Sequence, residues 1–230
     1  MIKLREQEYV SKRTPDIEKA RSPEKAITMI PEGECDAGLK TLRNKFCEVF
    51  PQPHRVSVVP ILRSGNRLGR ELTDHLGLKM NPMRMSYYSE DTSRLPEPIC
   101  ITKPDITQMI TGDGIVLPVA FTECVVESQG TILAAMMEIN NMIDEINKIT
   151  GASLPYPEYH TFAYVSKTGD NPILIPNFTA AFAVNPDIWV GGRGCDLPGD
   201  KGRNLSHLVG ILSPFAKKIP KRPYYLRIPR

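Results

Sequence analysis

The stretch that decides the fold is ECVVESQGT, residues Glu123–Thr131. It continues the apolar run Ile115–Phe121 and is followed by residues 131–149, in which apolar side chains recur at helical spacing. A buried strand that ends in a short turn of Ser, Gly and Thr and then opens a helix presents unpaired backbone N–H groups to an anion. The positive end of the helix dipole favours negative charge at the same place. The stretch therefore predicts a phosphate-binding turn.

Two carboxylates, those of Glu123 and Glu127, precede this turn. A phosphate pocket alone would not need them, because carboxylates repel phosphate. They offer acceptors for ribose hydroxyl groups, for a metal ion or for a reacting proton. The residues themselves leave these three roles open.

The chain around this stretch alternates between helix and strand patterns. Apolar spacing predicts helices over residues 36–50, 65–76 and 131–149, and strands over 55–62, 83–88, 115–121, 160–165 and 186–190. Pro118 predicts a bulge or a strand end within the third strand. This order predicts an α/β fold with a mainly parallel sheet flanked by helices.

The two ends of the chain differ from this central part. Residues 1–34 are charged and contain three prolines, which predicts an N-terminal arm or appendage. Residues 35–204 are predicted to form the core. Residues 205–230 contain short strand patterns around Pro214 and Pro220 and are predicted to fold back, with the arm, as a small hood subdomain.

Composition limits the classes of function. The chain has 230 residues, 41% of them hydrophobic, and a net charge of +3, which gives no reason to expect nucleic acid as a partner. Its five cysteines are odd in number and widely spaced, which speaks against a disulfide framework and against a zinc site. No apolar run approaches the ~18 residues of a membrane span. A cytoplasmic protein with no membrane partner is expected.

A second phosphate-binding pattern precedes the first by about sixty residues. Residues 60–65, PILRSG, follow a predicted strand and open a predicted helix with Gly65, so that backbone amides can approach a diphosphate while Arg63 supplies charge. Between Met83 and Pro104 the sequence then predicts a long polar loop that includes Ser86 and Tyr87.

The third pattern suits a planar ring. Lys167 follows a predicted strand, and about twenty residues later Trp189 and Val190 precede a glycine cluster. Asp196 and Arg203 come after that cluster. An aromatic face can stack on a base, glycines let the backbone approach it, Asp196 can accept a hydrogen bond or hold a metal, and Arg203 can pair with phosphate.

These three patterns, in this order over residues 55–212, resemble the type I phosphoribosyltransferases, and residues 167–203 are most similar to the hypoxanthine-guanine (6-oxopurine) enzymes. The PILRSG string and the turn GCDLPGD, residues 194–200, are similar to uracil phosphoribosyltransferases instead. The resemblance implies the α/β phosphoribosyltransferase fold with a hood. It also implies transfer of a 5-phosphoribosyl group from phosphoribosyl diphosphate (PRPP) to a nucleobase, with Mg²⁺ as cofactor and a homodimer or higher homo-oligomer as the assembly. The products would be a nucleoside monophosphate and pyrophosphate, as in purine salvage. Two alternatives are a uracil phosphoribosyltransferase and a catalytically weak regulatory module that binds PRPP or nucleotide.

The resemblance also implies a role for each motif residue. Glu127 and Glu123 would be catalytic, and Glu123 and Asp196 would hold the metal. The flexible loop that closes over the reaction would carry Ser86 and Tyr87. The base would contact Lys167, Trp189, Val190 and Asp196. PRPP and its phosphates would contact Leu62, Arg63, Ser64, Gly65, Ser128, Gln129, Gly130, Thr131 and Arg203.

The sequence departs from the family pattern within the deciding stretch. Glu127 stands where the family has a catalytic Asp, which moves the carboxylate by about one methylene. Cys124 replaces the second acid of the usual pair, and Gln129 is predicted to put a side chain where the backbone normally meets phosphate.

Overall fold

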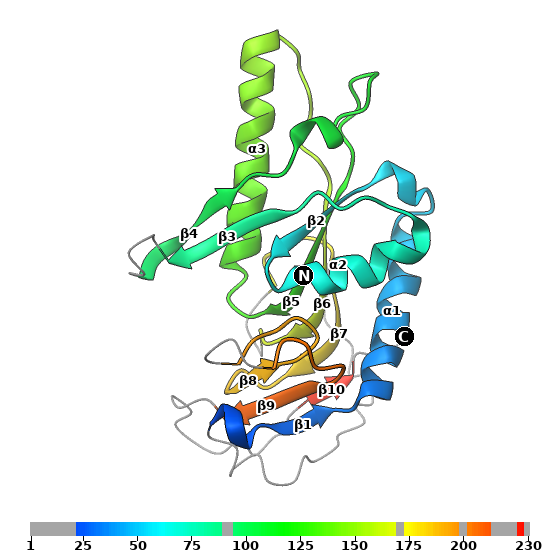
Figure 1. Cartoon of the computed structure of the whole chain (residues 1–230). Coiled ribbons are helices and arrows are strands. Elements are labelled where there is room, and N and C mark those ends of the chain that lie inside the picture. The colour runs from blue at the N-terminus through cyan, green and yellow to red at the C-terminus, as the bar shows by residue number, and fades with distance from the viewer. Residues whose placement is uncertain (1–21, 89–93, 169–172, 198–201, 213–224, 228–230) are drawn as a thin grey trace.

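The computed structural model describes residues 22–88, 94–168, 173–197, 202–212 and 225–227 (Figure 1). Most of the predicted arm and most of the residues predicted as the C-terminal part lie outside these ranges. Within them the chain is a mixed α/β structure, in which helices cover both faces of a larger sheet and a smaller sheet lies beyond one of its ends.

The larger sheet has a parallel centre and antiparallel edges. Its strands lie in the order β10-β7-β6-β5-β2-β3-β4, and β7, β6, β5, β2 and β3 run parallel to one another. The edge strands β4 and β10 are antiparallel to their neighbours. The strand bounds are β2 Ser57–Leu62, β3 Met83–Tyr88, β4 Arg94–Thr102, β5 Val119–Val126, β6 Tyr159–Ser166, β7 Phe178–Val184 and β10 Tyr225–Arg227.

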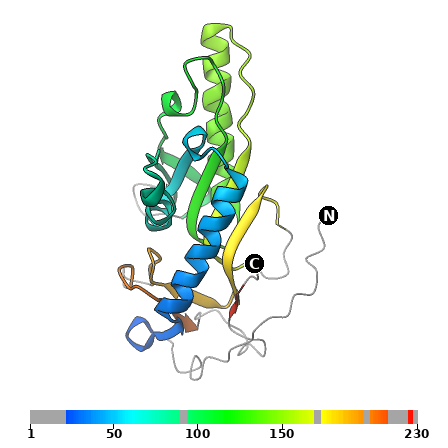
Figure 2. The same cartoon turned by 90° about the vertical axis from the view of Figure 1, so that its right-hand side faces the viewer.

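The smaller sheet joins distant parts of the sequence. Its antiparallel strands lie in the order β1-β9-β8, with bounds Ile27–Ile30, Leu208–Leu212 and Ile188–Gly191. The residue after β1 leads directly to α1, Glu32–Val49, so this helix runs from the smaller sheet along the larger one (Figure 2).

Helices cover the two faces of the larger sheet because its strands are apolar on both sides. Val58 of β2 faces the core that contains α1 and α2, Gly65–Thr73, whereas the next residue, Val59, faces the core that contains α3, Gly130–Thr150. The same alternation places Phe162 and Ala163 of β6 on opposite faces. Strands buried on both sides are typical of parallel sheets. The described part of the chain contains no helix long and apolar enough to cross a bilayer.

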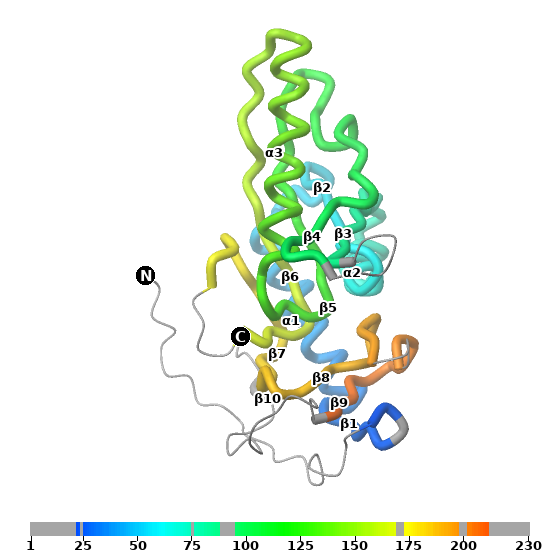
Figure 3. The backbone as a smooth tube through the Cα atoms, turned by 90° about the vertical axis from the view of Figure 1, so that its left-hand side faces the viewer, coloured from blue at the N-terminus to red at the C-terminus, as the bar shows by residue number. Residues whose placement is uncertain are grey.

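The longest helix, α3, ends within one residue of the position, 149, that the sequence predicts. Gly151 adopts φ 69°, and its N–H donates to the carbonyl of Asn147 at 2.9 Å. The following segment turns back beside α3 (Figures 1 and 3). Asn147 fixes this return, since its side chain exchanges two hydrogen bonds with the backbone of Leu154 at 2.8 and 3.0 Å.

Several sequence-based expectations need correction. The predicted long loop between residues 83 and 104 is mainly a hairpin of β3 and β4, with residues 89–93 outside the described part. The strand predicted from Ile115 begins only at Val119, after Pro118. The sequence reading also missed β1 and β7, which are short or interrupted by small residues. The remaining 3₁₀ turns are Pro23–Lys25, Pro53–Arg55, Asp74–Leu76 and Ile106–Gln108.

The topology gathers the three motifs at one edge of the sheet. The parallel strands β2, β5 and β6 all end there, at Leu62, Val126 and Ser166. The segments that follow them carry the two predicted phosphate-binding turns and Lys167. Ligands of α/β sheets bind at the carboxyl ends of parallel strands, so the fold places a site here.

Candidate functional site

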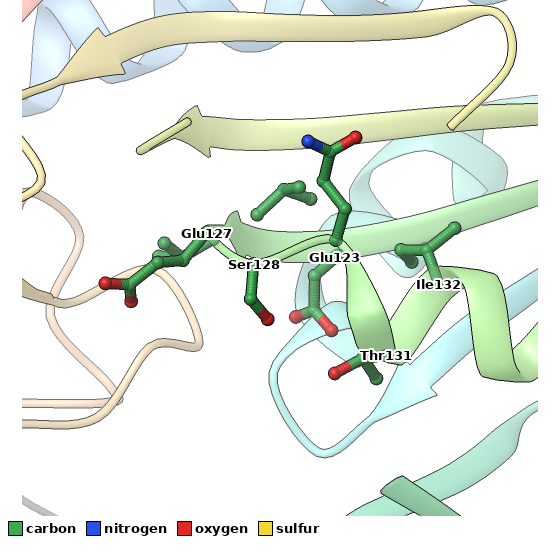
Figure 4. Close-up of a pocket in the computed structure, with 8 residues that line it drawn as sticks. Glu123, Glu127, Ser128, Thr131 and Ile132 are labelled. Carbon is green, nitrogen blue, oxygen red and sulfur yellow. The ribbon is translucent and has the colours of Figure 1, made fainter. Parts of the chain in front are cut away.

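The phosphate turn, residues 127–131, joins β5 to the first residues of α3. Figure 4 shows the hydroxyl groups of Ser128 and Thr131 and the carboxylate of Glu123 pointing into the same space beneath the turn, whereas the carboxylate of Glu127 points away from them. A pocket of about 100 Å³ lies here, lined by these four residues among others. With the first amides of α3, the two hydroxyl groups form a set of donors suited to a phosphate group.

Gln129 does not place its side chain where the sequence predicts. Its backbone takes the left-handed conformation, φ 62°, at the start of α3. The side chain is buried, and its Oε1 accepts hydrogen bonds from the backbone N–H groups of Leu174 at 2.6 Å and Ile175 at 3.2 Å. The side chain therefore ties the phosphate turn to the segment that leads into β7.

Glu123 links the two predicted phosphate-binding turns. Its Oε1 accepts a hydrogen bond from the hydroxyl group of Ser64 and another from the backbone N–H of Cys124 at 2.8 Å. Burial raises the pKa of this carboxyl group to about 7, while the hydrogen bonds from Ser64 and Cys124 act in the opposite direction. Glu123 can therefore change its charge near neutral pH.

The diphosphate turn, residues 62–65, lies against β5. Gly65 opens α2 in contact with the backbone of Thr122, so close that a Cβ atom at Gly65 would overlap the Thr122 carbonyl oxygen. The Thr122 hydroxyl donates to the carbonyl of Gly65 at 2.9 Å. Arg63, at the tip of the turn, is exposed, and the Leu62–Arg63 peptide bond is cis.

A larger cleft of about 500 Å³ adjoins the phosphate turn and shares Val125 and Glu127 with the smaller pocket. This volume is in the range that accepts a small-molecule ligand. The cleft brings together all four residues predicted to contact a base. It is lined by Ser64, Cys124, Val125, Glu127, Lys167, Trp189, Val190, Cys195, Asp196 and Leu197.

Two ion pairs set the charge of the cleft. The Lys167 side chain is 3% exposed and its Nζ lies 3.0 Å from Oε2 of Glu127, whose side chain is 59% exposed. Asp196, which also lines the cleft, is ion-paired with Arg203. Lys167, predicted to contact the base, and Arg203, predicted to contact the diphosphate, are thus each neutralised by a carboxylate of the protein.

Tyr87 reaches the phosphate turn from β3. The structure places Ser86 and Tyr87 in this strand, which the sequence predicted over residues 83–88, and not in the flexible loop that the resemblance implies. The Tyr87 hydroxyl lies so close to Gly130 that a Cβ atom there would overlap it. Glycine at position 130 thus makes room for the tyrosine.

Comparison with solved structures identifies the architecture. The chain superposes on a hypoxanthine phosphoribosyltransferase in which glutamic acid replaces an invariant aspartic acid with a TM-score of 0.59, at 16% identity, covering 81% of this chain and 95% of the other. The Trypanosoma cruzi hypoxanthine phosphoribosyltransferase gives 0.59 at 15% identity, with coverages of 82% and 91%. A Bacillus anthracis hypoxanthine-guanine phosphoribosyltransferase gives 0.53 at 16%, with coverages of 80% and 97%. The chain has the type I phosphoribosyltransferase fold.

Comparison by sequence alone gives no relative. A scan against protein-family models finds no match. A search of curated proteins by sequence likewise finds none. The likeness to the phosphoribosyltransferases is therefore one of fold.

The sequence reading missed a cross-link within this phosphoribosyltransferase fold. Cys124 and Cys195 form a disulfide across a sequence separation of 71, although the cysteine count and spacing spoke against a disulfide framework. Spacing gave no signal, because this pair joins two segments that only the fold brings together. A signal was nevertheless available, since each cysteine lies within one of the two motif stretches that the resemblance places around the same ligand.

The sequence analysis also did not predict that Arg193 holds the wall of the cleft in place. The base loop, residues 191–197, turns at Arg193, whose guanidinium group is buried and bonded to Asp36 of α1 and Glu71 of α2. Its Nε donates to the carbonyl of Ser206 at 2.6 Å. A buried arginine with several acceptors fixes a loop strongly, because its planar fork is directional.

Proposed function

We propose that the protein transfers the 5-phosphoribosyl group from PRPP to a nucleobase, and that the base is a 6-oxopurine such as hypoxanthine, guanine or xanthine. The observation that carries this proposal is the pair of adjoining pockets. One has the hydroxyl groups of a phosphate turn, the other has a buried lysine and an aromatic wall, and Glu127 lines both. A nucleoside monophosphate needs the same order of parts, with a phosphate at one end, a ribose in the middle and a planar base at the other.

The residues would share the reaction as follows. The bond from the anomeric carbon to the diphosphate oxygen breaks, and the bond to the base nitrogen forms. The ribose becomes positively charged in between, so that carboxylates close to it lower the barrier. Glu123 would accept from ribose hydroxyl groups, and Glu127 would lie near the base nitrogen that loses its proton. Ser128 and Thr131 would hold the 5-phosphate.

The base would be recognised on the far wall of the cleft. Lys167 would donate to the carbonyl oxygen of a 6-oxopurine, Trp189 would stack on the ring, and Val190 would contact it. The solved structures of similar fold include hypoxanthine and hypoxanthine-guanine phosphoribosyltransferases, which supports a purine. A uracil enzyme remains the alternative on sequence grounds.

Magnesium is proposed as the cofactor. Among the described residues, no three or more His, Cys, Asp or Glu side chains come together as a metal site. Mg²⁺ usually binds only one or two carboxylates together with substrate phosphates, so it does not require such a cluster. Asp196 on the cleft wall and Glu123 would be its carboxylates, and the ion would neutralise charge on the departing diphosphate. Arg203 would turn from Asp196 to the diphosphate oxygens.

The deciding experiment is a turnover assay with PRPP, Mg²⁺ and a panel of hypoxanthine, guanine, xanthine and uracil. Product nucleotide and pyrophosphate are both quantified. Formation of a purine nucleoside monophosphate with an equal amount of pyrophosphate supports the proposal. Turnover of uracil alone would overturn the purine assignment, and no turnover of any base would overturn the transferase.

A second candidate is a binding module that holds PRPP or nucleotide and regulates a partner. The ion pairs favour it, because Lys167 and Arg203 are already engaged by Glu127 and Asp196 in the protein alone. Glu127 in place of the family Asp points the same way. Calorimetric binding of PRPP or a nucleotide without turnover would favour this candidate over the transferase.

A further inference from the structure

The cleft has a disulfide in its wall. Cys124, on β5, and Cys195, in the base loop, have Cα atoms 5.9 Å apart, an ordinary separation for a disulfide. Both cysteines line the 500 Å³ cleft together with Glu127, Lys167 and Trp189. The cross-link therefore joins the strand that carries the phosphate turn to the loop that carries the base wall.

We propose that the Cys124–Cys195 disulfide is a redox latch: it holds the base loop on β5, and its reduction by a dithiol loosens the loop from β5 and weakens nucleotide binding. The effect on the loop follows from the fold alone, whereas the effect on the nucleotide rests on the proposed function.

The hydrogen bonds and ion pairs of the base loop, described next, attach it to parts of the protein other than β5. Gly192 and Cys195 bond to each other through their backbones, and the N–H of Gly194 donates to the carbonyl of Arg203 at 2.9 Å. The Arg193 side chain holds the loop to α1, α2 and Ser206. These bonds anchor the loop to itself, to the helices and to the segment before β9, while the disulfide adds a covalent anchor to β5.

The latch acts directly on the proposed ligand residues. Asp196 follows Cys195 in the chain, and Glu123 precedes Cys124. A closed latch thus fixes the distance between the two sides of the cleft before a ligand arrives. Such preorganisation strengthens binding, because less motion is lost when the ligand binds. The reduced protein must order the loop at the moment of binding.

The redox step uses a dithiol as reductant. One thiolate of the dithiol attacks a sulfur of the disulfide, so that the Cys124–Cys195 bond breaks and a mixed disulfide between protein and reductant forms. The second thiol of the reductant then attacks this mixed disulfide and releases the protein's thiol. The reductant leaves as its own disulfide, and the protein gains two electrons and two protons as two thiols. The described free cysteines, Cys35, Cys47 and Cys100, are not among the residues that line the cleft.

Access to the latch runs through the ligand cleft. Cys124 is 0% and Cys195 3% exposed, yet both belong to the cleft lining. A small dithiol entering the cleft can reach them, and a bound nucleotide would cover them. Because the closed latch binds the nucleotide more tightly, linkage requires the nucleotide to resist reduction of the latch to the same extent.

The first test needs no ligand. Wild-type protein is equilibrated with graded dithiothreitol, the free thiols are alkylated, and the cross-linked peptide is quantified by mass spectrometry. Amide hydrogen exchange of residues 189–197 is then measured in the oxidised and the reduced protein. We expect exchange in this segment to rise several-fold on reduction, while the middle of α3 is unchanged.

Two variants sharpen the result. Cys195→Ser should give the fast-exchanging loop whether or not dithiothreitol is present, whereas the exposed Cys47→Ser should keep the wild-type response. Equal exchange of the loop in oxidised and reduced wild type would overturn the latch. The comparison within the wild type decides the question even where Cys195→Ser does not fold.

The second test uses GMP as the probe. Calorimetric titration should give a dissociation constant several-fold larger for the reduced protein than for the oxidised one, and saturating GMP should slow reduction of the disulfide. Equal affinities in both states would overturn the effect on binding. If GMP binds to neither state, the proposed function loses its support, while the exchange experiment still decides whether the latch exists.

Discussion

Lys167 is buried at the end of β6 with its ammonium group 3.0 Å from the carboxylate of Glu127, which is more than half exposed. The two residues come from adjacent parallel strands, at the first positions after β5 and β6. The pair thus links the phosphate turn to the base side of the cleft. In the proposed reaction, Lys167 must redirect a hydrogen bond from Glu127 to the base.

The unequal burial of this pair predicts unequal effects of mutation. We expect Glu127→Gln to lower the free energy of unfolding by about 1–3 kcal/mol, because it leaves a buried ammonium group without its counter-charge. Lys167→Met should change it by less than about 1 kcal/mol, because the remaining carboxylate stays hydrated. Urea denaturation of both variants and of the double variant measures the difference. Equal losses for the two single variants would show that the pair is not organised as described.

Arg203 should separate PRPP binding from nucleotide binding. Its guanidinium group is paired with Asp196 in the protein alone, and a charge-assisted bond to a diphosphate oxygen is worth about 1.5–3 kcal/mol. Arg203→Ala should therefore weaken PRPP binding by about ten-fold or more, and Arg203→Lys should recover only part of it. Calorimetry with PRPP and with a nucleoside monophosphate checks this. Equal losses for the two ligands would point to a structural role of the arginine.

The sequence predicted the parts of the site better than their connections. The turn after β5 could be located because a strand, a turn and a helix each have their own local pattern, and the parallel order followed from their alternation. The pairing of Cys124 with Cys195 and the bonds of Arg193 could not be predicted, because they join segments that meet only in the folded protein. Strand β4 was read as part of a loop because charges and prolines interrupt its sequence, although a sheet edge tolerates both.

The buried carboxyl group of Glu123 should make stability depend on pH. Its pKa is raised from 4.5 in the unfolded chain to about 7 in the folded protein, chiefly by burial. The folded state therefore holds a proton that the unfolded state has lost, so this group stabilises the fold fully below pH 4.5, and the contribution is lost as the pH rises through 7. The total change in this contribution to the free energy of unfolding amounts to about 3 kcal/mol.

Glu123→Gln tests this dependence, because the amide keeps the shape of the side chain but does not titrate. Between pH 5 and pH 8, the unfolding free energy of the wild type should fall by about 2–3 kcal/mol relative to that of Glu123→Gln. Denaturation at several pH values in the absence of ligand measures it. A constant difference over this range would contradict the raised pKa.

Gln129 combines a left-handed backbone with a buried amide that serves two N–H donors, those of Leu174 and Ile175. We expect Gln129→Ala to lower the free energy of unfolding by about 1–3 kcal/mol, because the two donors lose their acceptor. Gln129→Gly loses the same bonds but adopts φ 62° without strain, so it should be about 1 kcal/mol more stable than the alanine variant. A glycine variant no more stable than the alanine one would show that the backbone conformation is not retained.

Gly130 and Tyr87 should behave as a coupled pair. An alanine methyl at position 130 would overlap the Tyr87 hydroxyl, whereas the next ring atom, Cζ, would lie at an ordinary contact distance of 3.7 Å. Gly130→Ala should therefore displace the tyrosine from the phosphate turn and offset the gain that alanine brings to a helix, which at this first helical residue is at most about 0.5–1 kcal/mol. In the Tyr87→Phe background, which lacks the hydroxyl, the same substitution should be stabilising by up to that amount. A double-mutant cycle of unfolding free energies measures the coupling, and ring resonances of Tyr87 in NMR spectra report its displacement. If Gly130→Ala has the same effect in both backgrounds, Tyr87 does not rest on the phosphate turn in solution.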